Sequence, residues 1–83
     1  SQFGVIPFII KPDTAMKYPV DFNKPFNQEP IVLYNIQYNT HDFVLSSQLN
    51  TVTQQGFEIQ LKSDVPEGGT QSTGKINWHA FVH

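Results

Sequence analysis

The sequence contains no cysteine and no arginine, and only 14% of its 83 residues are charged. Without cysteine, a disulfide framework, a thiolate metal site and a cysteine nucleophile are all excluded. Arginine is the preferred residue for bidentate contacts to phosphates and bases. Its absence, together with a net charge of −2, argues against a nucleic-acid partner. There is also no run of 18 apolar residues, so the sequence predicts no membrane insertion.

The small size of the chain predicts one domain that needs partners. We expect residues 1–83 to form a single β-sandwich domain, and a chain of this length buries roughly 60% of its unfolded surface. Small cysteine-free domains commonly gain stability by oligomerising or by belonging to a longer chain. We therefore expect self-association. We also expect residues 1–15, which hold the first strand, to be the junction to a shaft or preceding domain.

The apolar residues alternate with polar ones, which predicts strands with one buried face. Phe57, Ile59 and Leu61 share one face of their segment, and Trp78 and Ala80 share one face near the C-terminus. Turn signals recur about every ten residues, as in all-β sandwiches and barrels. The predicted fold class is all-β, a six-stranded antiparallel β-sandwich. Its strands are expected over residues 3–11, 17–22, 30–38, 43–52, 57–62 and 74–82.

Individual residues refine this prediction. Pro7 and Pro19 place their strands at sheet edges, because proline cannot donate a ladder hydrogen bond. Segment 30–38 is partly apolar on both faces, and we interpret it as a central strand with one face on the core and the other against a partner. Trp78 is interpreted as a core residue rather than as a platform for stacking a sugar.

Catalytic and metal sites are not predicted. Asp42 follows His41, but no serine or cysteine lies in a nucleophile-elbow context that would complete a triad. Asp64 and Glu67 offer two carboxylates, yet a compact sandwich of this size provides little cleft to hold a substrate between them. His79 lacks the converging ligands of a metal centre. We therefore expect no enzyme, no cofactor and no metal.

Three segments resemble the H-type lectin domain family, which includes the snail agglutinin and the receptor-binding tips of phage tail fibres. Residues 20–32 (VDFNKPFNQEPIV) resemble the opening V-x-F-x-x-P-F-x-x-x-P-x-V of these domains. Residues 52–59 (VTQQGFEI) and 76–80 (INWHA) are similar to the family's fifth strand and closing strand. The resemblance implies a six-stranded antiparallel sandwich assembled as a parallel trimer. It also implies sugar binding between protomers, usually of galactose or N-acetylgalactosamine.

The family's sugar-binding residues are mostly replaced in this sequence. The Trp-His pair that these lectins carry between strands five and six is missing from residues 63–73. Val44 stands where they have an arginine, and only Asp13 offers an acid in the first turn. The resemblance therefore extends to the scaffold and the assembly more than to the identity of the sugar.

The predicted site lies in three turns. In an up-and-down chain, residues 12–15, 38–43 and 63–73 fall at the same end of the sandwich. Carboxylates and amides there suit paired sugar hydroxyls, and a tyrosine suits a pyranose face, although turns collect such residues in any protein. The predicted carbohydrate-binding residues are Asp13, Thr14, Tyr38, Asn39, His41, Asp42, Asp64 and Glu67.

These observations favour a non-catalytic, trimeric, lectin-like module that binds carbohydrate. A receptor-binding tip of a phage tail fibre or a similar adhesin is expected, with a cell-surface glycan or polysaccharide as its target. Its location would be extracellular or on the virion surface. The lack of cysteines and N-glycosylation sequons argues against a secreted animal lectin. The alternative is a structural trimerisation or fibre-capping domain that binds no sugar.

Overall fold

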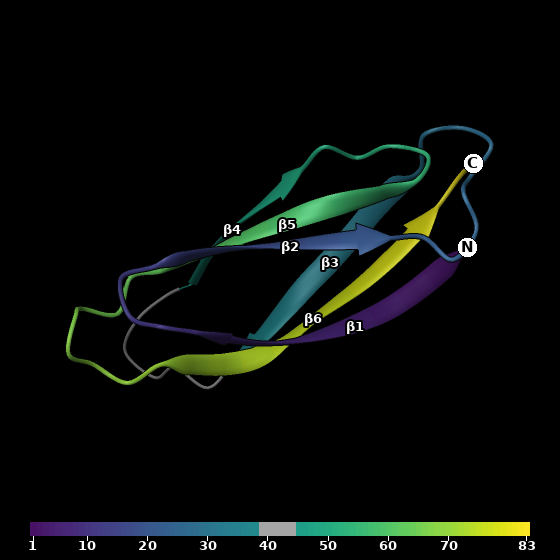
Figure 1. Cartoon of the computed structure of the whole chain (residues 1–83). Coiled ribbons are helices and arrows are strands. Elements are labelled where there is room, and N and C mark those ends of the chain that lie inside the picture. The colour runs from purple at the N-terminus through teal and green to yellow at the C-terminus, as the bar shows by residue number, and fades with distance from the viewer. Residues whose placement is uncertain (39–44) are drawn as a thin grey trace.

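The computed structural model describes residues 1–38 and 45–83, which form six antiparallel strands and no helix (Figure 1). The prediction of an all-β chain with six antiparallel strands is confirmed. Most strand ends differ from the predicted ones by one or two residues. The strands are β1 (Gln2–Ile10), β2 (Ala15–Asp21), β3 (Ile31–Tyr38), β4 (Leu45–Asn50), β5 (Gly56–Ser63) and β6 (Ser72–Phe81).

The strands form two three-stranded sheets, ordered β1-β6-β3 and β2-β5-β4. Only β4 and β5 are consecutive strands paired in one sheet, so every other connection crosses between the sheets. The molecule is elongated, measuring 46 × 18 × 17 Å along its principal axes. The β1–β2 and β5–β6 loops lie at one end, whereas the β2–β3 and β4–β5 loops lie at the other end with both chain termini (Figure 1).

The positions of the prolines confirm one prediction, and the place of β3 contradicts another. Pro7 lies in β1 and Pro19 in β2, and both strands are sheet edges. Segment 30–38 was expected to be a central strand, but β3 is an edge strand and β6 is the centre of its sheet. The apolar character of both faces of β3 comes from Ile31 and Leu33 on the outer face. Side-chain patterning reports which faces are apolar, and it does not report how many neighbours a strand pairs with.

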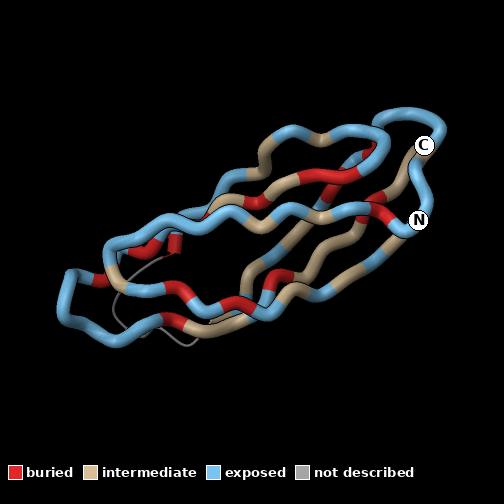
Figure 2. The backbone as a smooth tube through the Cα atoms, viewed as in Figure 1, coloured by how far each residue is buried: buried red, intermediate tan, exposed pale blue. Residues whose placement is uncertain are grey.

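The core lies between the two sheets and includes residues from both. Ile10, Ile59, Leu61 and Ile76 are fully buried at its centre. Figure 2 shows that the buried positions lie mainly on the strands, while the loops at both ends are mostly exposed. Burial inward and exposure outward follow the alternation of side chains along each strand.

Trp78 lies on the inner face of β6 and packs against this core. The centroid of its indole lies 5.2 Å from that of Phe57, in an edge-on arrangement, and 5.9 Å from that of Phe22. The interpretation of Trp78 as a packing residue is therefore confirmed.

Candidate functional site

The two described turns of the predicted sugar site lie at the same end of the molecule, as expected (Figure 1). Asp13 occupies the β1–β2 turn with a φ of 52°, and Asp64 and Glu67 lie in the β5–β6 loop. All three carboxylates are exposed. The predicted residues Asn39, His41 and Asp42, and Val44, lie outside the described residues.

Thr14 and Tyr38 have structural contacts. The Thr14 hydroxyl donates a hydrogen bond of 2.7 Å to the Lys11 carbonyl oxygen, and the Thr14 carbonyl accepts one of 2.9 Å from the Ser63 amide. Thr14 therefore closes its own turn and ties it to the end of β5. Tyr38 is half-buried against the core and lines a depression of about 670 Å³, together with Pro7 and Lys75 among others.

The outer faces of the two sheets differ strongly in polarity. On the β1-β6-β3 sheet, Phe3, Val5, Ile9, Ile31 and Leu33 are exposed, with 72% of Phe3 and 57% of Leu33 accessible. Lys75 is the one charged side chain on the described strands of this face. We call this surface the apolar face. The outer face of the β2-β5-β4 sheet is instead formed mainly by polar and charged residues, and Ala15 and Pro19 also lie on it. Its polar and charged members are Lys17, Asp21, Ser46, Gln48, Asn50, Glu58, Gln60 and Lys62.

A histidine lies on the central strand of the apolar face, near the end of β6. His79 is paired with Phe3 on one side and with Leu33 on the other. Its ring stacks on Phe3 with centroids 4.1 Å apart and an angle of 10°, and it lies 4.9 Å from the ring of Phe81. The Nε2 atom is buried and makes no hydrogen bond to any residue that the structure describes. His79 therefore extends the aromatic surface of this face.

Many outward-facing amides bond to one another across the strands. The Asn77 amide donates hydrogen bonds of 2.9 Å to the side-chain oxygens of Asn35 and Gln37, which links β6 to β3. On the other sheet the Asn50 amide donates to Glu58 at 3.2 Å and to Gln60 at 3.4 Å. These side chains have part of their hydrogen-bonding capacity already used within the fold.

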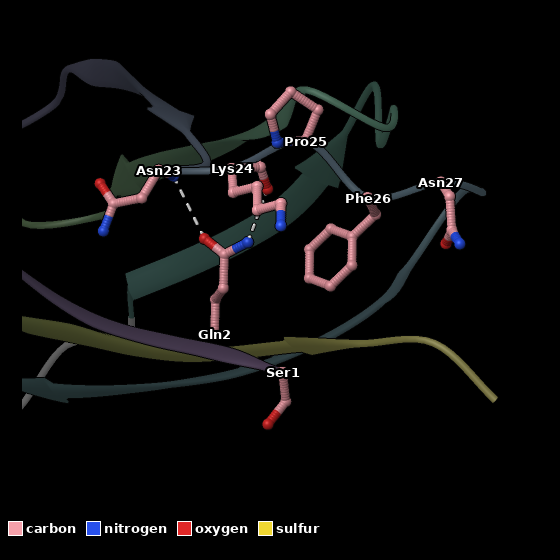
Figure 3. A pocket seen from close by; sticks show the side chains of 7 residues that line it. All are labelled: Ser1, Gln2, Asn23, Lys24, Pro25, Phe26 and Asn27. Atoms are coloured by element: carbon pink, nitrogen blue, oxygen red, sulfur yellow. Dashed lines mark hydrogen bonds between the residues drawn. The ribbon is translucent and has the colours of Figure 1, made fainter.

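A pocket of about 540 Å³ lies at the opposite end of the molecule from the predicted site. It is formed between the start of β1 and the β2–β3 loop. Its lining residues are Ser1, Gln2, Asn23, Lys24, Pro25, Phe26 and Asn27. Figure 3 shows the Phe26 ring lying between the side chains of Lys24 and Asn27, with Gln2 reaching up to the loop from β1. We call this site the Phe26 pocket.

Hydrogen bonds from two directions hold the loop of the Phe26 pocket. The Gln2 amide donates to the Lys24 carbonyl oxygen at 2.8 Å, and its oxygen accepts from the Asn23 backbone amide at 3.2 Å (Figure 3). The Phe26 amide donates to the Gln54 carbonyl at 2.9 Å. The Phe26 ring also stands edge-on against Phe22, with centroids 4.9 Å apart.

From the sequence, residues 23–29 were placed only between two predicted strands, and the pocket was missed. One signal was available in the sequence, because an aromatic residue lies among Asn23, Lys24 and Asn27. The contribution of Gln2 could not be predicted from the sequence. Gln2 lies 21 residues before Asn23, and the packing of the two sheets brings the two residues together.

No metal centre or membrane span is found in the described part of the chain. Residues 1–38 and 45–83 contain no group of three or more His, Cys, Asp or Glu residues that could hold a metal ion. They also contain no helix of the length and hydropathy that crossing a membrane requires. Comparison of the sequence with family models and with curated proteins gives no match.

Proposed function

We propose that the chain is a non-catalytic carbohydrate-binding module that acts as a self-associated assembly. The apolar face on the β1-β6-β3 sheet carries the association part of this proposal, and the exposed polar groups of the end loops support the sugar-binding part. A trimer is the assembly that the resemblance to H-type lectins implies. As a trimer the module would serve as a receptor-binding tip that recognises a cell-surface polysaccharide.

The composition of the apolar face supports association with further copies of the same chain. Contiguous apolar patches on monomeric proteins rarely exceed a few hundred Å². Here Phe3, Val5 and Ile9 follow one edge strand, and Ile31 and Leu33 follow the other. On its described strands the face carries one lysine, the uncharged amides of Asn35, Gln37 and Asn77, and no acid, so a strongly charged partner would find little electrostatic complement on it. Contact with the same face of a second copy would bury the apolar surface of both chains.

Carbohydrate binding is supported by the polar groups at the ends of the molecule. Asp13, Asp64 and Glu67 are exposed on adjacent loops, and carboxylates accept hydrogen bonds from paired sugar hydroxyls. A single shallow site would bind weakly. Several sites on one assembly would raise the overall affinity through effective concentration.

Association is tested with a pair of matched variants. Leu33→Lys introduces a charge on the apolar face, whereas Gln48→Lys places the same side chain at an exposed position of β4 on the polar sheet. We expect Leu33→Lys to give the monomer mass in light scattering and Gln48→Lys to retain the mass of the unmodified assembly. Equal masses for the two variants would contradict association through this face.

Sugar binding is tested by titrating simple N-acetylated hexosamines and bacterial surface oligosaccharides while backbone amide NMR spectra are recorded. Chemical-shift changes that are confined to the loops at either end of the molecule would support the proposal. Unchanged spectra across a broad panel would contradict it.

The second candidate function is a trimerisation or fibre-capping domain that binds no sugar. One observation favours it: the Trp-His pair and the arginine that the lectins use for sugar are replaced in this sequence. In this case the apolar face would still associate, and the NMR titrations would give no shifts.

A further inference from the structure

We infer that the Phe26 pocket is a binding site for an acidic saccharide, such as a uronic acid unit of a polysaccharide. This inference rests on the proposed carbohydrate-binding function and moves the principal site to the end opposite the predicted loops. It is carried by the side chains that surround the Phe26 ring, by their freedom from other partners and by the rigidity of the loop.

Three polar side chains of the pocket, those of Asn23, Lys24 and Asn27, are free to bind a ligand, whereas that of Gln2 is bonded to the loop. The ammonium group of Lys24 and the side-chain amides of Asn23 and Asn27 make no hydrogen bond or ion pair within the described residues. By contrast, Asn77 and Asn50 donate to neighbouring strands. Lys24, Asn23 and Asn27 are also exposed.

The chemistry of the lining selects an anionic sugar. Among the described residues that line the pocket, Lys24 has the only charged side chain and none is acidic. An ammonium group attracts a carboxylate, and primary amides donate and accept hydrogen bonds with vicinal hydroxyls. The half-buried Phe26 ring supplies an apolar wall for the C–H face of a pyranose, and ligand sites typically combine such walls with a few placed polar groups.

The loop is held in place before any ligand arrives. Gln2 fixes the backbone at Asn23 and Lys24, and the carbonyl oxygen of Gln54 in the β4–β5 connection fixes it at Phe26. The side chain of Gln54 adds a hydrogen bond of 3.4 Å to the Asn27 carbonyl. Because little backbone must be ordered on binding, less of the interaction energy is lost to conformational entropy. Gln2 is a positioning residue in this site.

The pocket also adjoins the apolar face, because Gln2 immediately precedes Phe3 in β1. An assembly formed through that face would therefore carry one pocket beside each contact. Repeated acidic units along a polysaccharide would then engage several pockets at once.

The test is an NMR titration of the whole chain with trigalacturonic acid and, as a neutral counterpart, with its methyl ester. We expect the acid to shift the amides of residues 2 and 23–27, high salt to weaken binding, and the ester to bind much less tightly. Lys24→Gln should weaken the binding of the acid by about tenfold, the loss expected for one charge-assisted hydrogen bond. Lys17→Gln, which removes the same charge from the outer face of β2, should leave binding unchanged.

Three outcomes would overturn the inference, and they are distinguishable. Shifts confined to residues 11–14 and 64–71 would overturn the Phe26 pocket while supporting carbohydrate binding. Equal binding of the acid and its ester, or equal effects of Lys24→Gln and Lys17→Gln, would overturn the acidic specificity alone. Unchanged spectra with these sugars and with the neutral panel described above would overturn both the pocket and the carbohydrate-binding function.

Discussion

At the scale of single residues, the aromatic side chains divide between packing and exposure. Phe22, Phe57 and Trp78 contact one another within the sandwich, whereas Phe3 and His79 stack on its outer surface. The alternation of side chains along β5 and β6 was enough to predict that Phe57 and Trp78 lie inside, whereas the inward position of Phe22 was not predicted. The stacked outer pair was not predictable, because the register that places Phe3 opposite His79 is set by long-range pairing.

Replacement of Trp78 by alanine should destabilise the fold. The indole packs against Phe22 and Phe57, and its removal leaves a cavity as well as losing transfer free energy. We expect a loss of about 3 kcal/mol in the free energy of unfolding, measured by chemical denaturation at a fixed protein concentration. A midpoint equal to that of the unmodified chain would contradict the packing role. Lys17→Ala, at an exposed site, is the control.

Tyr18 should make the free energy of unfolding decrease at alkaline pH. Burial raises the pKa of Tyr18, because desolvation disfavours the phenolate. The unfolded chain therefore loses this proton first, and the contribution of Tyr18 to stability is full below a pH of about 10 and falls as the pH rises above it. Tyr18→Phe should lose less stability than the unmodified chain over that interval in thermal melts. Parallel pH profiles for the two proteins would be inconsistent with this effect.

At the scale of elements, β6 organises its sheet because it pairs with both β1 and β3. The strands themselves were predictable from alternation, and the edge positions of β1 and β2 from Pro7 and Pro19. The order of strands within the sheets was not, since β3 is as apolar as a central strand and yet lies at an edge. The Phe26 pocket was missed for a related reason, because it joins β1 to a loop that is distant in the sequence.

Gly74 lies where β6 closely approaches β3, and its replacement tests this approach. A β-carbon at this position would overlap the carbonyl oxygen of Gln37, which is a backbone atom and cannot move aside freely. Gly74→Ala should therefore destabilise the fold by about 1–3 kcal/mol, the usual cost of forcing extra atoms into a packed site. Lys75→Ala, one residue further along β6 and exposed, should have a much smaller effect. Chemical denaturation of both variants measures the difference, and equal stabilities would argue against the close approach.

At the scale of the whole molecule, the two outer faces of the sandwich differ in polarity. The polar β2-β5-β4 face suits solvent, and the apolar β1-β6-β3 face suits burial against further copies. The sequence suggested association from the small size of the chain and from the apolar segment 30–38. The exposure of Phe3, Val5 and Ile9 on the same face needed the pairing of β1 with β6, which no local pattern encodes.

The molar mass of the unmodified chain in solution tests the central claim most directly. Sedimentation equilibrium at micromolar concentrations should give three times the 9.5 kDa mass of the chain, because the apolar face favours association and the resemblance to H-type lectins implies a trimer. A mass of 9.5 kDa across the same concentrations would show that this face stays exposed, and it would contradict the proposed assembly.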